Sequence, residues 1–299
     1  MKKKHKIIIV IIVPILLLVG YFVYKYKSVA DKIENVEIDK SNETLKISPE
    51  KEVEAIEKKI YNFALYGLDR RNESDPARSD CIIIVTVNEK TNTIKLSSIM
   101  RDTYVPIEAH GKTKINHAYA YGGAELALGT LNSNFDLDIK DYVAVNFWDA
   151  IEIIDLIGGI SIDVHDDEVK HISGVDSPGI YNLTGTQALA YSRIRYEAGG
   201  DYVRTDRQRT VLTSMFKKIM SLSNKQKYDL IPMIASNIET SMTDEYILKL
   251  ATSVITNDIS NIEDKRYPTE GKGQKIKGVY YLVADLEQLK GELQAFIYN

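Results

Sequence analysis

The feature that most restricts the fold is the segment Cys81–Val87, which reads CIIIVTV and is almost entirely apolar and β-branched. A short run of this kind is typical of a strand in the centre of a sheet, buried on both faces. Similar strand patterns occur at 63–67, 93–99, 142–147 and 160–164, and helical patterns occur at 117–131, 148–157, 184–191, 205–223, 228–238 and 244–256. Strands interspersed with helices predict an α/β fold, a single layered domain with a central mixed β-sheet flanked by helices.

The N-terminus carries a longer apolar segment. Residues 7–24 contain no charged side chain, and they follow the basic stretch MKKKHK. In a helix they would span about 27 Å, close to the roughly 30 Å hydrocarbon core of a bilayer. Because lysines stay on the inner side, we expect a cytoplasmic tail at 1–6, a single transmembrane helix at 7–24 and the rest of the chain outside. A cleaved signal peptide is the alternative, but the run is long for one and no small-residue cleavage site follows closely.

Charge is unevenly distributed along the chain. Residues 25–58 alternate in sign, which predicts a solvated stalk, partly helical near 50–60, with the domain at 59–299. The chain has 38 basic and 42 acidic residues, and six of its lysines precede residue 28, so the remainder carries a charge of −10. This excess of acid excludes a nucleic-acid partner, which requires a basic face. The single cysteine, Cys81, excludes an intramolecular disulfide, and its place in the apolar strand predicts core packing.

Two acidic residues are expected at one edge of the sheet. Asp69 follows strand 63–67, and Arg78-Ser-Asp80 precedes strand 81–87. If these strands are adjacent and antiparallel, both carboxylates lie at the same end. Paired carboxylates without histidine or cysteine suit a hard cation such as Mg²⁺. The structural alternative is a solvated loop with Arg–Asp surface pairs.

Two more motifs follow the strand at 93–99. Arg101-Asp102 comes directly after it, where the arginine points into a cleft or pairs with its neighbour in a turn. The stretch KTKINHAYAYGG at 112–123 places a lysine and an asparagine at the start of a small-residue helix, where they can contact phosphate or sugar. His117 reads as a packing residue at the helix start, and the tyrosines read as core or rim more than as a sugar platform.

The strongest signal is the window 191–209, which is rich in arginine. The protein has 28 Lys and ten Arg, yet five of the ten arginines lie in this window and no lysine does. The guanidinium group binds phosphate or carboxylate through two parallel hydrogen bonds, which an ammonium group cannot do. The window therefore predicts a binding site for an anion such as phosphate.

The spacing within this window predicts how the side chains are presented. Arg193 and Arg195 point the same way if their segment is extended. Arg204, Arg207 and Gln208 share one side of the following helix, at positions i, i+3 and i+4. The structural alternative is that the arginines pair with the acidic residues of the same window, which are Glu197, Asp201 and Asp206.

The motifs supply fixed cations and two carboxylates for a metal, but they pair no nucleophile with a base. This combination fits phosphoryl-group chemistry, in which positioning and charge neutralisation dominate. The sequence contains no GxxxxGK[ST] loop, which excludes a nucleoside triphosphatase of the P-loop type.

These motifs together resemble the LytR–CpsA–Psr family. The matching residues lie in the family's order over residues 61–222: Gly67-Leu-Asp69, Arg78-Ser-Asp80, Arg101-Asp102, Lys114-Ile-Asn116, Gly122-Gly123, Asp155, Gly158-Gly159-Ile160, Arg193-Ile-Arg195, Asp201, Arg204 and Arg207-Gln208. The resemblance implies a membrane-anchored phosphotransferase. Such enzymes move a glycopolymer, of teichoic acid or capsular polysaccharide type, from an undecaprenyl-pyrophosphate carrier onto peptidoglycan. The alternatives are a polyprenyl-phosphate-binding or pyrophosphatase module without transfer, and a membrane-bound transcriptional attenuator.

The resemblance also implies roles for individual residues. Asp69 and Asp80 would hold Mg²⁺, or Mn²⁺ in its place. The pyrophosphate would be bound by Arg78, Arg101, Arg193, Arg195, Arg204, Arg207 and Gln208. The catalytic residues would be Arg101, Asp102, Arg193 and Arg195, with the general base left open between Asp69 and Asp102. Met100 replaces the proline that the family pattern places before the Arg-Asp pair, which predicts a looser turn.

Overall fold

The computed structural model describes residues 34–69, 77–194, 201–234, 237–256, 259 and 261–299. The predicted tail and transmembrane helix at 1–24 lie outside these ranges. Within them, none of the helices combines the length and the apolar character that crossing a bilayer requires.

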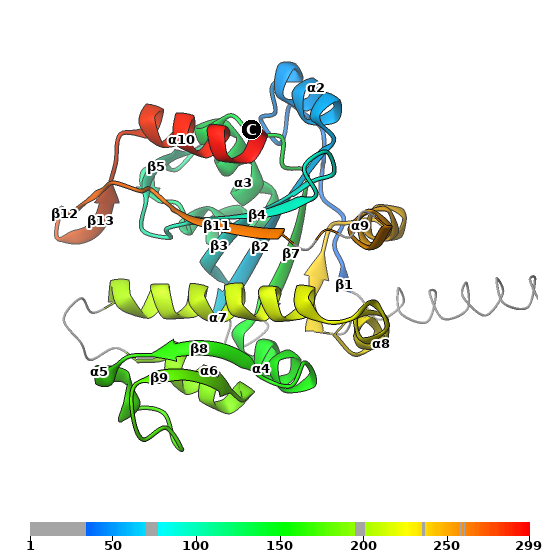
Figure 1. The fold of residues 1–299 in the computed structure, drawn as a ribbon. Helices are drawn as coiled ribbons and strands as arrows, with labels where there is room; N and C mark the ends of the chain where they lie inside the picture. Colours follow the sequence, from blue (N-terminus) through cyan, green and yellow to red (C-terminus); the bar gives the residue numbers. More distant parts are fainter. Residues whose placement is uncertain (1–33, 70–76, 195–200, 235–236, 257–258, 260) are drawn as a thin grey trace, which may run out of the picture.

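A seven-stranded mixed sheet forms the centre of the molecule (Figure 1). In spatial order its strands are β1 (Glu34–Asn35), β10 (Glu239–Thr240), β7 (Asp141–Asn146), β2 (Ile60–Asp69), β3 (Arg78–Asn88), β4 (Thr93–Ile99) and β11 (Asn261–Tyr267). β3 runs antiparallel to β2 and β4, whereas β7 is parallel to β2 and β11 is parallel to β4. The CIIIVTV segment is therefore an interior strand, and the predicted mixed sheet is confirmed.

Helices cover both faces of the sheet (Figure 1). One face carries α2 (Pro49–Lys58), α3 (His117–Phe135) and α10 (Leu286–Tyr298), and the other carries α4 (Phe147–Leu156), α6 (Gly185–Ser192), α7 (Asp201–Ser221), α8 (Asn224–Ile234) and α9 (Asp244–Thr256). Successive strand residues face opposite sides of the sheet. Ile82 and Ile84 therefore pack against α2, α3 and α10 in what we call the first core, while Ile83 and Val85 pack in the second core on the other face. Truncating the fully buried Ile83 to alanine would cost about 2–5 kcal/mol of stability.

Three hairpins lie outside the sheet. They are β5 (Tyr104–Ile107) with β6 (Gly111–Lys114), β8 (Ile160–Val164) with β9 (Gly179–Leu183), and β12 (Lys272–Ile276) with β13 (Val279–Val283). The β8–β9 hairpin, next to the short helix α5 (Asp166–Val169), packs on the side of α7 that faces away from the sheet (Figure 1). Only the strand at 160–164 among these was predicted from the sequence.

Three helices differ most from their predicted ranges. α8 (Asn224–Ile234) begins and ends four residues before the predicted range 228–238. α3 is interrupted at Gly122 and Gly123, and Gly123 has a φ of +63°, a left-handed conformation that glycine adopts without strain. The first turn of α3 is thereby set apart from the longer segment after it. α7 begins at Asp201, four residues before the predicted start at 205, so Arg204 is already within the helix.

Residues 34–58, which the charge pattern assigned to a stalk, pack on the domain instead. β1 adds a short strand to the sheet beside β10, and Leu45 and Ile47 are buried in the first core. Ser48 caps α2 by accepting the Lys51 N–H on its hydroxyl oxygen at 3.3 Å. The predicted stalk is therefore wrong for residues 34–58, which belong to the domain, because two isolated apolar residues anchor an otherwise charged segment.

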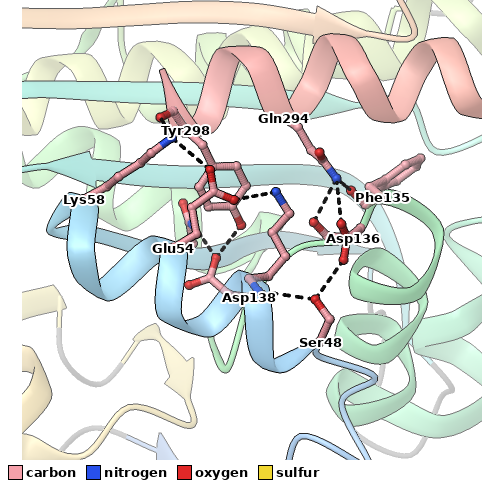
Figure 2. Close-up of polar contacts among 10 residues, drawn as sticks. Ser48, Glu54, Lys58, Phe135, Asp136, Asp138, Gln294 and Tyr298 are labelled. Atoms are coloured by element: carbon pink, nitrogen blue, oxygen red, sulfur yellow. Dashed lines mark hydrogen bonds and ion pairs between the residues drawn. The ribbon is translucent and has the colours of Figure 1, made fainter.

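Polar contacts tie the C-terminal helix α10 both to the end of this segment and to the end of α3 (Figure 2). Gln294 Nε2 donates to the carbonyl oxygen of Phe135 at 2.9 Å, and Tyr298 Oη donates to Asp138 Oδ1 at 2.6 Å. Lys58 Nζ, at the end of α2, donates to the carbonyl oxygen of Tyr298 at 2.9 Å. These contacts join α2, the end of α3 and α10 into one layer.

Candidate functional site

The predicted acidic pair lies at the edge of the sheet where β2 ends and β3 begins. Asp69 pairs with Arg78 across the two strands, so their antiparallel arrangement is as expected. The Asp69 side chain itself lies outside the described part of the structure. Gly67 pairs with Cys81 and Leu68 pairs with Ser79, which leaves Asp80 as an extra residue in β3. Such a β-bulge redirects a side chain, and here it occurs at Asp80.

Asp80 is part of a buried chain of charged side chains. Its Oδ2 lies 2.9 Å from Nη1 of Arg101, and its Oδ1 accepts a hydrogen bond from Asn116 Nδ2 at 3.3 Å. Arg101 Nε lies 3.5 Å from Asp102 Oδ2, and Lys114 Nζ lies 2.5 Å from Asp102 Oδ1. Two carboxylates thus alternate with two cations, the condition under which buried charges are tolerated. Arg101 pairs with both carboxylates, in a buried position at the end of a strand.

The turn that carries Arg101 and Asp102 is closed by hydrogen bonds. Thr103 donates to the Met100 carbonyl oxygen from its backbone N–H at 3.0 Å and from its hydroxyl at 2.6 Å. The Met100 N–H donates to the Tyr267 carbonyl oxygen at 2.8 Å and so extends the ladder between β4 and β11. The expectation of a looser turn is wrong, because methionine supplies a donor here that proline lacks.

Cations border this buried chain on its exposed side. Arg78 is exposed at the start of β3, and Lys114 is half-buried at the end of β6. Burial, and then the charges of Arg78 and Lys114, lower the pKa of His117. The His117 Nδ1 atom lies 3.0 Å from the Thr113 hydroxyl and 3.4 Å from the Tyr121 hydroxyl. Two cations thus border the sheet edge, and they favour an anion bound beside Arg78 and Lys114.

The arginine window spans the end of α6 and the beginning of α7. Arg193 ends α6 in a helical conformation, with φ −97° and ψ −5°, and its side chain is exposed. The extended geometry expected there is wrong at Arg193, and Arg195 lies outside the described residues. Arg204 and Gln208 belong to one helix, α7, as predicted, but the Arg204 side chain is not described. Gln208 is buried, and its Oε1 has no hydrogen-bond partner among the described residues.

Arg207 has a setting that the sequence did not predict. Its Nε lies 2.6 Å from Oε1 of Glu168, and its Nη1 donates to the Ile194 carbonyl oxygen at 3.2 Å. This partner comes from α5, and the acidic side chains of the arginine window itself lie outside the described part of the structure. Arg207 is thus held by contacts within the protein, to Glu168 and to the backbone of Ile194. This geometry does not favour a direct contact of Arg207 with pyrophosphate, which stays a prediction.

The predicted metal site is described only in part. Among the residues that the structure covers, no three acidic, histidine or cysteine side chains gather closely enough to hold a metal ion. Asp80 is a carboxylate placed by a bulge at the sheet edge, a donor of the type that Mg²⁺ takes from proteins. The chemistry of this donor fits the ion, and the second predicted ligand is Asp69. Cys81, next to the site, is buried, and burial raises the pKa of its thiol to about 12, as expected of a packing residue.

Fold and site together define a three-layer α/β protein with a buried carboxylate–arginine chain at the sheet edge and exposed cations beside it. The sequence pattern of the LytR_cpsA_psr family matches residues 20–295, and the chain belongs to this family. A polyisoprenyl-teichoic acid–peptidoglycan teichoic acid transferase, TagU, of Bacillus mycoides (strain KBAB4) is 35% identical over 298 residues, which covers 95% of this chain and 94% of that protein. TagU of Bacillus subtilis (strain 168) is 33% identical, with 95% and 92% covered. The chain is accordingly an enzyme of the transferase class.

Solved structures agree with this assignment. The crystal structure of TagT of B. subtilis has a TM-score of 0.63 at 29% identity, with 80% of this chain and 91% of that chain covered. A structure of TagT with bound octaprenyl pyrophosphate lipid has a TM-score of 0.59 at 27% identity, with 80% and 90% covered. The mixed α/β fold is thus that of the family.

Proposed function

We propose that this enzyme transfers a glycopolymer of the teichoic acid type from an undecaprenyl-pyrophosphate carrier onto peptidoglycan. The observation that carries the proposal is the buried chain Asp80–Arg101–Asp102–Lys114 at the sheet edge. It holds two carboxylates and two cations in fixed positions beside the exposed Arg78, and fixed charges of this kind can orient a pyrophosphate and a cation bound with it. The relatives named as teichoic acid transferases, and the relative that binds octaprenyl pyrophosphate, support the same substrate class.

In the proposed reaction a hydroxyl group of peptidoglycan attacks the phosphorus atom that bears the glycan. A new oxygen–phosphorus bond forms, the bond to the bridging pyrophosphate oxygen breaks, and polyprenyl phosphate leaves as the hydroxyl proton is lost. Charge on the transferred phosphoryl group would be neutralised by the exposed Arg78 and Arg193 and by the half-buried Lys114, with Arg195 and Arg204 as further predicted partners. The buried Arg101 would hold Asp80 and Asp102 in place. This assignment needs no protein nucleophile.

Three further parts of the proposal concern a metal ion, the amide of Gln208 and the N-terminal segment. Mg²⁺, or Mn²⁺, would be held by Asp80 together with Asp69 and would neutralise pyrophosphate charge. Gln208 would help to bind the anion through its buried amide group, whose oxygen has no hydrogen-bond partner among the described residues. Residues 7–24 would form a single-pass anchor in the cell membrane, with the N-terminus in the cytoplasm and the domain outside.

The test is transfer by the purified full-length chain in detergent. The donor is a polyprenyl-pyrophosphate-linked saccharide with a radiolabelled sugar, and the acceptor is a soluble glycan strand of peptidoglycan. We expect label to appear in the acceptor, and we expect Arg101→Ala and Asp80→Asn to lower the rate at least about 100-fold, as loss of a charge-stabilising group does. The matched control is Asp138→Asn, which alters a half-buried carboxylate at the opposite end of the strands and should leave the rate unchanged.

Four outcomes would each overturn a part of the proposal. Wild-type rates in Arg101→Ala would remove the site from the reaction. Tight donor binding with no label transferred to any acceptor would instead identify a binding module, and release of free glycan phosphate would identify a pyrophosphatase. A reporter fused after Asn299 and found in the cytoplasm would contradict the proposed topology.

A further inference from the structure

The β12–β13 hairpin concentrates positive charge in an otherwise acidic domain. Residues 272–283 contain three lysines and no acidic residue, although the chain after residue 27 carries a net charge of −10. The three are Lys272, Lys275 and Lys277; all are exposed, and none forms an ion pair with a residue that the structure describes. Lysines on other parts of the surface, such as Lys46 and Lys140, pair with glutamates instead. The charge of the hairpin is therefore open to a partner.

The three lysines are spread along the whole hairpin, which projects from the domain beside β5 (Figure 1). Lys272 lies at its base and Lys275 lies near its tip. Lys277 stands in the turn, where it and Gly278 have φ values of +50° and +82°, as in a two-residue type I′ turn. The strand from 272 to 277 spans about 17 Å at the usual rise per residue. A row of cations of this length suits an extended polyanion more than a single phosphate.

The base of the hairpin is fixed to the turn that carries Asp102. The backbone N–H of Leu282 donates to the carbonyl oxygen of Asp102 at 2.8 Å. The neighbouring Tyr281 contacts Tyr104 of β5, with ring centroids 4.7 Å apart. The ammonium group of Lys114, which pairs with Asp102, lies 6.0 Å from the centroid of the Tyr281 ring. The hairpin therefore begins at the buried chain of charges and leads away from it.

Cations continue from the site onto this hairpin. Tyr104 pairs with Lys114, and Lys112 is two residues from Lys114, so all three lie on one face of the β5–β6 hairpin. On the β12–β13 hairpin, Lys272 shares the face of Tyr281 and is its diagonal neighbour, at roughly 7–8 Å in ladders of this kind. The contact between Tyr104 and Tyr281 joins the two faces, so the basic surface is continuous with the phosphate site.

The charge pattern selects the part of the substrate that this surface would meet. A polymer linked by phosphodiesters carries a negative charge at each repeat, so it can contact cations at several positions along the hairpin. The acidic remainder of the domain repels such a chain, which favours the basic hairpin as its path away from the site. Exposed charges of this kind steer and orient a partner and make its binding sensitive to salt.

We infer that the β12–β13 hairpin, with Lys112 beside it, binds the phosphodiester backbone of the glycopolymer that the donor carries. The inference rests on the proposed function, because it names where the polymer lies beyond the reacting phosphorus atom. The repeats nearest the pyrophosphate would pass the contact between Tyr104 and Tyr281, and later repeats would follow the lysines toward the tip of the hairpin.

The kinetic test uses the full-length chain in detergent and donors of two lengths. One donor carries a long poly(glycerol phosphate) chain, and the other carries a single disaccharide on the same polyprenyl pyrophosphate. Lys272→Gln combined with Lys275→Gln should raise the KM for the long donor about tenfold at low ionic strength, as loss of two exposed ion pairs does. The KM for the short donor should stay unchanged, and the effect on the long donor should shrink in high salt.

Two further double variants serve as controls. Lys272→Arg combined with Lys275→Arg keeps both charges and should keep the wild-type KM for the long donor. Lys225→Gln combined with Lys227→Gln removes the same number of charges from α8, on the other side of the domain (Figure 1), and should not change that KM either.

Binding of soluble poly(glycerol phosphate), measured by calorimetry without donor or acceptor, gives a readout that does not depend on turnover. Weaker binding by the Lys272→Gln, Lys275→Gln variant than by the arginine variant supports the inference, even if the wild type transfers nothing and the proposed function fails. Unchanged polymer binding and an unchanged KM for the long donor in the glutamine variant, with transfer intact, would overturn the inference alone.

Three other results would assign the lysines elsewhere, and each would overturn the inference. An equal rise in KM for both donors would place the lysines at the pyrophosphate. A raised KM for the peptidoglycan acceptor alone would place them on the acceptor. A lower affinity for phosphatidylglycerol in mixed detergent micelles, with polymer binding unchanged, would place them against the membrane surface.

Discussion

Arg207 Nε lies 2.6 Å from Glu168 Oε1, and each of these side chains is only 4% exposed. The other Glu168 oxygen accepts the His165 N–H at 2.9 Å, which closes a capping box at the start of α5. Arg207 also donates to the carbonyl oxygen of Ile194, the residue after Arg193. One buried ion pair thereby connects α5 and α7 to the backbone of the arginine window.

The first prediction concerns Glu168→Ala. It leaves the Arg207 guanidinium buried without its carboxylate, so we expect the free energy of unfolding to fall by about 3–5 kcal/mol. The backbone at Ile194 should also lose its fixed position, and the KM for the polyprenyl-linked donor should rise. Urea unfolding and donor kinetics measure the two effects separately.

A double variant separates stability from positioning. Glu168→Leu together with Arg207→Met replaces the pair by apolar side chains, which should recover much of the lost stability. The Ile194 carbonyl still lacks its donor, so the donor KM should remain high. If the donor KM returned to the wild-type value along with stability, Arg207 would have no positioning role.

The second prediction concerns Met100→Pro. Proline matches the family pattern at this position, but it removes the N–H that donates to the Tyr267 carbonyl oxygen. That oxygen would lose its partner at a buried residue, and we expect a loss of about 1–3 kcal/mol in the free energy of unfolding. Met100→Leu keeps the N–H and should lose little. Equal stability of the proline variant and the wild type would show that the hydrogen bond contributes nothing.

The parts of the fold that follow from local pattern could be predicted from the sequence. The apolar β-branched run at 81–87 identified an interior strand, and the ends of β2 and β3 placed Asp69 and Asp80 at one edge. The helical spacing of Arg204 and Gln208 was likewise correct, since both lie in α7. In each case the signal and its structural consequence lie within a few residues of each other.

The parts that depend on long-range contacts could not be predicted. β11 is a mostly exposed, charged strand, which joins the sheet by backbone pairing with β4 and therefore shows no apolar alternation. The partner of Arg207 is 39 residues away, at Glu168, and nothing in the arginine window points to it. Leu45 and Ile47 are single apolar residues among charges, too few to indicate a core segment. The bulge at Asp80 is a matter of strand register, which only the paired strand reveals.

The third prediction concerns the pH dependence of stability through Asp138. Burial raises the pKa of this carboxyl group, while hydrogen bonds from Tyr298 and Asn62 and the charge of Lys140 act in the opposite direction. Its folded pKa lies above the unfolded value of about 3.9, so the folded state binds the proton more tightly. This contribution to stability is present below about pH 3.9 and is lost as the pH rises through the folded pKa.

Comparison with Asp138→Asn separates the contribution of Asp138 to the pH dependence of stability from the contributions of other titrating groups. The free energy of unfolding of the wild type, relative to the variant, should increase as the pH is lowered from 7 toward 4. Urea unfolding at several pH values measures the difference. Tyr246 and Tyr298, whose pKa values Asp138 raises, stay protonated throughout this range. A difference that stays constant over this range would mean that Asp138 has the same pKa in both states.

The fourth prediction concerns the divalent cation. Removal of metal by EDTA should abolish transfer, and Mg²⁺ or Mn²⁺ should restore it, because a pyrophosphate beside two carboxylates needs a cation to offset their charge. Asp80→Asn should raise the Mg²⁺ concentration for half-maximal activity by at least roughly tenfold, as loss of a metal contact does. The reference variant is Asp163→Asn, an exposed carboxylate on the remote strand β8, which should not change that concentration. Full transfer activity in EDTA would exclude a metal at Asp80 and leave that carboxylate as a partner of Arg101 alone.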